Sequence, residues 1–364
     1  MVRDGTAAPG TVMWYNREAA DGTDVASAID SICKTYVERV VKLGWRRGAY
    51  LELGHPVDGQ VELRCFRLTF NGQQERRAVR AWKMLARVRI LVSNPTTPLT
   101  TMGAEWYSWC KQSGFFKKRH EVSQAVDDVC AAVAYLRGRP CPRGATNIGA
   151  DSSGKLAGSA WWIPPGGSDM QSLEQWVGIP GHVADIEAAQ FDVGTAKAII
   201  IVESNAAFDT LVQGRIFEQL PCILVSGGGQ PALATRALVA RLANEFELPV
   251  IGYFDFNAAG VAIAAAYKYG SRSVSLHGHQ CDRLQLAGLS AKHVEERVPG
   301  TKVFTITAKE VAAIASQESR APYADDVELS RALSELRIRG GKAELEAVDE
   351  LLAYVVATTT TLVG

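Results

Sequence analysis

Three pieces of sequence within Ala196–Gly270 decide the fold: AKAIIIVESNAAFDTLVQ, PCILVSGGGQPALATRALVARLANEF and LPVIGYFDFNAAGVAIAAAYKYG. Each piece begins with a short apolar run rich in Ile and Val, at Ala198–Val202, Cys222–Val225 and Val250–Phe254. Each then continues with apolar residues at helical spacing. Short apolar runs that alternate with helical patterns predict βα units around a parallel sheet covered on both faces. We therefore expect an α/β fold.

Acidic residues follow two of these three predicted strands. Glu203 follows the first and Asp255 the third, with Asn257 two residues later and Gly260 at the start of the next helix. Parallel strands joined by right-handed crossovers end at one edge of a sheet, where ligands of open α/β folds bind. Converging carboxylates suit Mg²⁺, which prefers hard oxygen ligands. The same residues are also compatible with solvated loop acids or helix N-caps.

The wording of several segments resembles one protein family. Glutamate after the first strand and an Asp-x-Asp-like element after a later one are similar to the Toprim domain of topoisomerases, primases and some nucleases. GQPALATRALVARL and FDFNAAGVAI resemble segments of the topoisomerase VI A-type protein and of its eukaryotic relative, the meiotic double-strand-break transesterase. Further similar segments are Tyr267–Ser271, Gly341–Val348 and, with one residue order changed, Ser152–Gly158. Several matches in the same order make the resemblance specific.

Composition bounds the possible functions. The chain has 364 residues, enough for two or three domains, with 47% hydrophobic residues, 21% charged residues and a net charge of +0. Any DNA contact must therefore come from a local patch and not from a global positive field. The seven cysteines are scattered without a C-x-x-C pair, which predicts reduced thiols and no zinc ribbon. We expect no signal peptide and no membrane segment.

The resemblance and the patterns together imply four regions. Residues 1–74 match the family poorly, with a predicted helix at Val25–Leu43 and a hairpin within Tyr50–Phe70. Residues 75–158 are expected to be a winged-helix domain that binds DNA and carries the reactive tyrosine. Residues 159–195 are expected to link it to a Toprim domain at 196–364. The C-terminal part is predicted to contain helices at Lys309–Glu318, Asp326–Leu336 and Lys342–Val356, while its apolar end is interpreted as a strand or an interface.

Tyr107 is the second candidate reactive group in the sequence, after the acidic residues. It lies in Gly103-Ala-Glu-Trp-Tyr, where the family has an Arg-x-Ile-Tyr/Phe-Tyr motif that ends in the nucleophile, so the resemblance implies that Tyr107 is the nucleophile. The family's arginine falls on Gly103, which leaves the contact to the scissile phosphate unassigned. Nearby cations are Lys111, Lys117, Lys118 and Arg119. The alternative is that Tyr107 belongs to an aromatic cluster that packs in a core.

Four basic side chains are candidate DNA contacts. Arg80 lies in a basic amphipathic segment, 76–92, which is either near DNA or a core helix with a solvated face. Lys111 follows the tyrosine motif. Lys155 lies in a strip that nearly spells a P-loop but has Leu156 where Ser or Thr would bind Mg²⁺, so we expect no ATP site in this chain. Arg236 is expected at the surface of the helix after the second strand.

The resemblance implies a DNA double-strand-breaking transesterase that forms a 5′-phosphotyrosyl link with the help of Mg²⁺. It also implies a homodimer, because the tyrosine of one subunit works with the metal site of the other, and a separate B-type ATPase or transducer partner. The divergent N-terminal 75 residues favour the nuclear, meiotic form over a topoisomerase subunit; a prokaryotic chain would be cytoplasmic.

Asn257 is the most informative departure, because the family has an aspartate there. An amide removes one negative charge, so we expect weaker Mg²⁺ binding or a preference for Mn²⁺. A second hypothesis is therefore a cleavage-deficient DNA-binding paralogue or structural subunit of a topoisomerase VI-like complex. A third is a Toprim nuclease or primase, although no Cys/His pairing supplies a primase zinc element.

Overall fold

The chain forms two compact units, each with its own hydrophobic core. The computed structural model describes residues 12–13, 22–43, 50–57, 60–67, 73–94, 99–112, 116–271 and 278–363. The first unit comprises residues 1–151 and 271–278, and the second comprises 152–270 and 279–364. The division after Asp151 differs from the boundary expected after residue 158, because residues 155–158 form a strand in the sheet of the second unit.

Among the described residues of the second unit, six strands form the central sheet in the order β14-β13-β11-β12-β6-β9. β11, β12, β13 and β14 are parallel, whereas β6 and β9 are antiparallel to their neighbours on the edge beyond β12. The three predicted strands are thus confirmed as parallel neighbours. The strands are β6 Lys155–Gly158, β9 Val177–Gly178, β11 Ile199–Val202, β12 Ile223–Ser226, β13 Val250–Tyr253 and β14 Leu284–Leu286.

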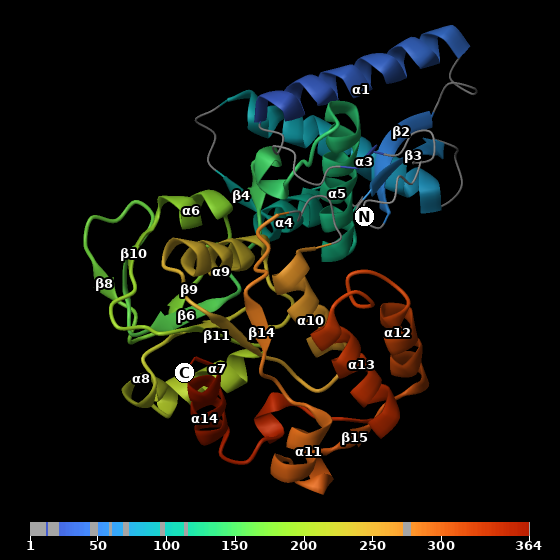
Figure 1. Cartoon of the computed structure of the whole chain (residues 1–364). Coiled ribbons are helices and arrows are strands. Elements are labelled where there is room, and N and C mark those ends of the chain that lie inside the picture. The colour runs from blue at the N-terminus through green and yellow to red at the C-terminus, as the bar shows by residue number, and fades with distance from the viewer. Residues whose placement is uncertain are drawn as a thin grey trace. The chain divides into compact units, whose positions relative to one another are not determined.

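Helices cover both faces of this sheet. Figure 1 shows α7, α8 and α14 on one face and α9 and α10 on the other. The change of face between α7 and α9 follows from right-handed crossovers, because the chain moves from β11 to β12 and then back past β11 to β13. The helices of this unit are α6 Val183–Ala188, α7 Asn205–Gln213, α8 Ile216–Gln219, α9 Leu233–Glu245, α10 Ala258–Tyr269, α11 Ala291–Arg297, α12 Ala308–Glu318, α13 Val327–Arg339 and α14 Leu351–Val363.

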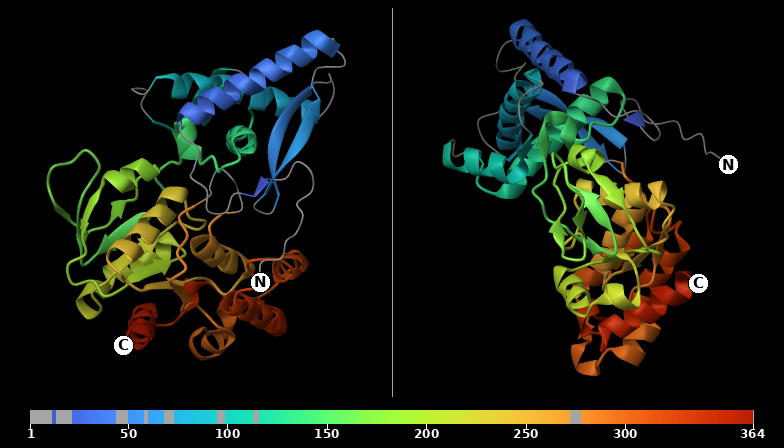
Figure 2. Two further views of the ribbon diagram at one scale, coloured as in Figure 1. Left: turned by 45° about the horizontal axis from the view of Figure 1, so that its top comes forward. Right: turned by 90° about the vertical axis from the view of Figure 1, so that its left-hand side faces the viewer.

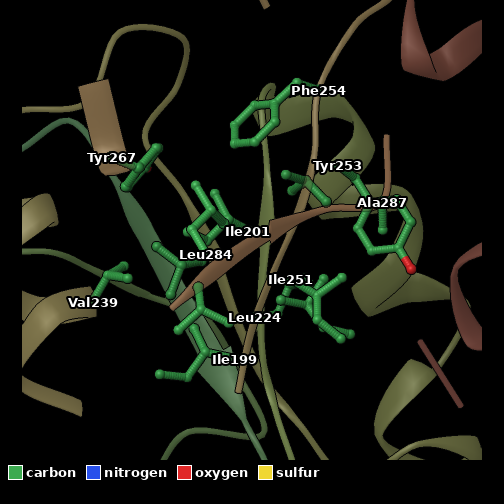
Figure 3. Close-up of a cluster of buried hydrophobic side chains, with 14 of the residues drawn as sticks. Ile199, Ile201, Leu224, Val239, Ile251, Tyr253, Phe254, Tyr267, Leu284 and Ala287 are labelled. Atoms are coloured by element: carbon green, nitrogen blue, oxygen red, sulfur yellow. The ribbon is translucent and has the colours of Figure 1, made fainter. Parts of the chain in front are cut away.

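The core of the second unit lies between these two helical layers. Each of β11, β12 and β13 is buried along its whole length. Figure 3 shows side chains from neighbouring strands, among them Ile199, Leu224 and Ile251, gathered in this core with Val239 and Tyr267 of the covering helices. Burial on both faces explains why these strands are continuous apolar runs without alternation.

Residues 152–195 are part of this unit and not a separate connection. β6 pairs with β12, which places the strip expected at the end of the tyrosine-bearing domain inside the central sheet. Residues 159–195 contribute β9 to the same sheet and form a small antiparallel sheet in the order β10-β7-β8. Its strands are β7 Trp161–Ile163, β8 Gln171–Ser172 and β10 Gln190–Asp192. The Pro and Gly residues of this region mark turns between short strands.

The C-terminal end differs from its predicted structure. The helix expected at Lys342–Val356 is β16 (Gly341–Lys342), a 3₁₀ turn (Leu345–Ala347) and then α14. The apolar end, interpreted as a strand or an interface, lies within that helix. Thr360 and Thr361 donate hydrogen bonds to the carbonyl groups four residues earlier, and Tyr354, Val355 and Thr359 are buried. Burial and these hydrogen bonds outweigh the weak helix propensity of the threonines. The other short elements of the unit are β15 (Phe304–Thr305) and a 3₁₀ turn (Gly300–Lys302).

Helix α9 begins without a side-chain cap. Its N-cap is Ala232, one residue after Pro231, and no side-chain hydrogen bond is made there. Ala232→Asp is expected to stabilise the protein by about 1 kcal/mol, because a carboxylate at an N-cap accepts a free backbone N–H and faces the positive helix end. Thermal unfolding measures the gain, and Ala232→Asn separates the hydrogen bond from the charge. An unchanged or lower midpoint in both variants contradicts this expectation.

The first unit combines helices with a small sheet. Its described elements are β1 Val12–Met13, α1 Gly22–Leu43, β2 Tyr50–Val57, β3 Gln60–Arg67, α3 Gln73–Ser93, β4 Thr100–Thr101, α4 Met102–Gln112, α5 Arg119–Arg137, a 3₁₀ turn Arg143–Thr146 and β5 Ile148–Gly149. The predicted hairpin is confirmed as β2 and β3, which pair antiparallel with β1 on the outer side of β3. Figure 2 shows the hairpin beside the helices of the unit, where β2 contacts α5.

Helix α1 contributes to the same hydrophobic core as α3, α4 and α5. Val25, Ala28, Ile29 and Ile32, at the spacing of one helical face, are buried against α3 and α5. Residues 22–43 are therefore integral to the first unit, whereas the sequence suggested a separate extension over residues 1–74. The winged-helix interpretation stays a prediction. None of the described helices is long and apolar enough to span a bilayer.

Candidate active site

The carboxyl ends of β11 and β13 bring two acidic side chains together. Glu203 directly follows β11, and its Oε2 accepts a hydrogen bond of 3.0 Å from the backbone N–H of Asp255. The convergence expected from strand order is therefore present. The helix caps at this edge are Ser204, which accepts from Ala207, and Asn257, which accepts from Gly260. Glu203 and Asp255 are thus not themselves N-caps, so their carboxylates do not accept the N–H groups at these helix ends.

A third carboxylate arrives from the C-terminal strip. The backbone of Phe256 pairs with Ala343, and the N–H of Leu345 donates a 2.8 Å hydrogen bond to Asp255 Oδ1. The Ser204 hydroxyl donates to a carboxylate oxygen of Glu346. We call Glu203, Asp255 and Glu346 the acidic edge. Sequence reasoning missed Glu346, although it had singled out Gly341–Val348 as similar to a family segment; that similarity was the only available signal.

Electrostatics of the acidic edge are unfavourable without a cation. Burial is the main cause that raises the pKa of Glu203 to about 7, with the charge of Asp255 next. Burial likewise raises the pKa of Asp255 to about 6, and the charges of Glu346 and Glu344 add to the shift against the N–H of Leu345. Partly buried like charges that repel one another favour a bound cation or a proton.

The side-chain oxygens of Glu203 and Asp255 fit a Mg²⁺ ion that takes only a few of its ligands from the protein. Among the described residues, no three His, Cys, Asp or Glu side chains are arranged as a metal-binding group. Mg²⁺ nevertheless commonly takes one or two protein carboxylates and completes its shell with water and substrate phosphates. Glu203 and Asp255 meet that requirement. Asn257 Oδ1 accepts from Gly260 at 2.8 Å and its Nδ2 lies 3.3 Å from Asp255 Oδ2, so its amide also supports the cap and Asp255.

Gly260 makes room for this arrangement. A Cβ at Gly260 would lie 2.4 Å from the backbone oxygen of Asp255 and 3.0 Å from Glu203 Oε2. Gly260→Ala is therefore expected to cost about 1–3 kcal/mol of stability, because backbone cannot move aside as a flexible side chain does. Thermal unfolding measures the loss. Gly300→Ala is the matched control, since nothing lies within 4 Å of its added Cβ; equal effects of the two variants argue against a steric role.

Tyr107 lies in helix α4 of the first unit with its side chain 62% exposed. Its aromatic neighbours behave differently, because Trp106 and Trp109 pack against the core of that unit and Trp109 lies 5.5 Å from Phe116 between ring centroids. The Trp109 indole also donates to buried Glu105. Trp106, Trp109 and Phe116 thus pack in a core, as the alternative proposed, whereas Tyr107 is exposed. This exposure makes the Tyr107 side chain accessible to a macromolecule.

Comparison with known proteins bears directly on the second unit. Residues 198–359, from the start of β11 into α14, match the family model TOP6A-Spo11_Toprim, which describes the Toprim domain shared by Spo11 and the A subunit of topoisomerase 6.

Residues 198–359 belong to this Toprim family.

Curated relatives agree with that assignment. Meiotic recombination protein SPO11-2 of Oryza sativa subsp. japonica is 31% identical over 222 residues, covering 59% of this chain and 55% of the relative. Meiotic recombination protein SPO11 of Mus musculus is 31% identical over 170 residues, or 46% and 41% of the two chains. The A subunit of DNA topoisomerase 6 from Arabidopsis thaliana is 28% identical over 163 residues, or 44% and 36%. The chain thus matches about half or less of the length of these relatives.

Two candidate DNA contacts lie in the unit that contains the Toprim domain. Arg236 is only 2% exposed, so its predicted surface position is wrong. The reason is that α9 packs inside the unit, where Arg236 interacts with the buried Tyr267 of α10. Burial lowers the pKa of Arg236 to about 10. Lys155 opens strand β6, whereas a P-loop lysine opens a helix. Its ammonium lies 2.7 Å from Asp209 and 4.6 Å from the Trp176 ring centroid, so its charge is already compensated.

The other two candidates lie in the first unit. Arg80 pairs with Glu121 at 2.8 Å, with both side chains 15% exposed. Other arginines of α3 behave likewise: Arg77 pairs with Asp128 and Arg87 with Glu105. This pairing between helices supports the core-helix interpretation of the basic segment over the DNA-contact interpretation. Lys111 lies in α4, but its side chain is outside the described residues.

Proposed function

We propose that the chain is a DNA double-strand-breaking transesterase that acts in meiotic recombination. The observation that carries the proposal is the pair of half-buried carboxylates, Glu203 and Asp255, at the carboxyl edge of a Toprim sheet whose relatives include meiotic recombination proteins and topoisomerase 6 A subunits. The exposed side chain of Tyr107 adds a nucleophile of the right kind.

The proposed reaction is one phosphoryl transfer. The Tyr107 oxygen attacks the phosphorus of a DNA phosphodiester, its proton passes to water or a nearby base, and the bond to the 3′ oxygen breaks. The 3′ oxygen leaves as a hydroxyl after taking a proton, and the protein remains joined to the 5′ end. Mg²⁺, or Mn²⁺, held by Glu203, Asp255 and Asn257, supplies positive charge to the phosphate when bound. Glu346 adds to the negative potential that attracts the cation.

The family resemblance also implies an assembly. We propose a homodimer, in which the tyrosine of one subunit serves the acidic edge of the other, so that both strands of duplex DNA are cut. Strand passage or ATP gating requires a separate B-type partner. The meiotic relatives favour action on chromosomal DNA in the nucleus.

An adduct assay tests the proposal. The full chain, with and without a B-type partner, is incubated with supercoiled plasmid in Mg²⁺, Mn²⁺ or EDTA and then denatured. We expect linear product with protein attached to its 5′ ends in either metal and none in EDTA. Linear product without attached protein indicates a Toprim nuclease and refutes the transesterase.

A specific observation favours one competing function, a cleavage-deficient DNA-binding subunit of a topoisomerase VI-like complex. Asn257 brings no charge to the acidic edge and its amide caps α10. Gly103 carries no side chain where the family resemblance implies an arginine. Retained duplex binding without any adduct, in either metal and with the partner present, decides for this subunit.

A further inference from the structure

Arg119 lies beside the helical turn that precedes Tyr107. Its guanidinium forms an ion pair with the carboxylate of Asp151. The other oxygen of that carboxylate accepts a 3.1 Å hydrogen bond from the backbone N–H of Gly103 in α4. A Cβ built on Gly103 would lie 2.6 Å from the same oxygen, so the carboxylate occupies the place where a side chain at 103 would begin. All of these residues belong to the first unit.

Helix geometry puts this pair on the same face of α4 as Tyr107. Residues four apart in a helix lie one above the other, so Gly103 and Tyr107 share a face. Side chains in helices lean toward the N-terminus and cover the preceding turn. The Tyr107 side chain therefore leans toward the turn of Gly103, against which Asp151 holds Arg119.

We propose that Arg119 is the cation that contacts the DNA phosphate attacked by Tyr107, with Asp151 as its positioning residue; the catalytic part of this inference rests on the proposed transesterase function. Arginine presents five N–H donors in a planar fork, so a carboxylate can hold one edge while the remaining donors meet a phosphate. Gly103 contributes to this arrangement, because a side chain at position 103 would displace the Asp151 carboxylate.

Accessibility distinguishes Arg119 from Arg77 and Arg80 of helix α3. Its side chain is 58% exposed and that of Asp151 is 35% exposed. The arginines of α3 that pair with Asp128 and Glu121 are 24% and 15% exposed, and they join helices within the unit. An exposed ion pair is weak in water and competes little with a phosphate for the guanidinium. Arg119 can therefore serve a ligand without loss of the fold.

Duplex binding is the first test and does not depend on cleavage. A fluorescein-labelled duplex oligonucleotide is titrated with the full chain in EDTA over a range of salt concentrations. Arg119→Ala is expected to weaken binding several-fold and to reduce the slope of log affinity against log salt by about 0.9, the value for one lost phosphate contact. Arg215→Ala, at another exposed and paired arginine, is the matched control and should leave the slope unchanged. An unchanged affinity and slope in Arg119→Ala overturns the proposal.

Adduct formation is the second test. With saturating DNA, Arg119→Ala is expected to lower the adduct rate about 100-fold, and Arg119→Lys about tenfold because lysine lacks the fork. Free guanidinium should restore part of the Arg119→Ala rate where sodium does not, and so should Gly103→Arg in that background. A purely structural ion pair predicts neither rescue.

The outcomes separate the two ideas. A full adduct rate in Arg119→Ala, with loss in Tyr107→Phe, overturns the role of Arg119 and keeps the transesterase. No adduct from the unsubstituted chain in any metal, with the partner present, rejects the transesterase; the salt slope of Arg119→Ala then decides alone whether Arg119 contacts a phosphate. Lys117→Ala is a further control. If it lowers the rate of adduct formation as much as Arg119→Ala does, the assignment of the phosphate contact to Arg119 alone is contradicted.

Discussion

Tyr107→Phe is expected to abolish covalent attachment of the protein to DNA, with a loss of more than about 10³-fold, and to leave duplex affinity within about twofold. The substitution removes the attacking oxygen and nothing else, and a phenyl ring cannot form a phosphoryl link. Since the side chain is 62% exposed in α4, loss of its hydroxyl leaves no core atom unpacked. Denaturing electrophoresis of end-labelled DNA after incubation in Mg²⁺ or Mn²⁺ measures the adduct.

Tyr135→Phe is the matched control, because Tyr135 belongs to the same unit and packs partly buried against its core. It should retain the full adduct yield. Thermal unfolding of both variants checks that the fold is intact. An adduct that persists in Tyr107→Phe shows that another residue is the nucleophile and removes the chemical basis of the proposed function.

Glu203→Gln is expected to have two opposite effects. It should reduce metal-dependent adduct formation by about 10³-fold, because it removes one of the two carboxylates nearest the proposed cation. It should also stabilise the metal-free protein by on the order of 2 kcal/mol at pH 8, because the folded state then no longer holds a partly buried charge whose pKa is raised to about 7. Glutamine keeps an oxygen that can accept the 3.0 Å hydrogen bond from Asp255.

The direction in which Glu203→Gln changes the unfolding midpoint, with and without metal, tests whether the acidic edge binds a cation. In EDTA, the unfolding midpoint of Glu203→Gln should lie above that of the unsubstituted chain. On addition of Mg²⁺ or Mn²⁺, the unsubstituted chain should gain stability and the variant should not. Glu218→Gln is the matched control, because Glu218 is exposed in the same unit. Destabilisation of Glu203→Gln in EDTA, or an equal metal response in both proteins, contradicts a metal role for the acidic edge.

Local sequence patterns predicted much of the second unit. The runs rich in Ile and Val became β11, β12 and β13, and the positions of Glu203 and Asp255 after two of them were enough to expect their convergence. The reason is that strand-and-helix alternation and crossover handedness are properties of short segments. The addition of β6 to the sheet could not be predicted this way, because its pairing with β12 joins residues far apart in the chain.

The sequence by itself determined the parallel βα core and the acidic residues at its edge, since each follows from residue spacing within one or two elements. Tertiary structure alone decided that Arg236 is buried, that Glu346 reaches Ser204, and that Asp151 holds Arg119 beside Gly103. These facts depend on which distant segments pack together, and packing is a property of the folded chain and not of any stretch of it.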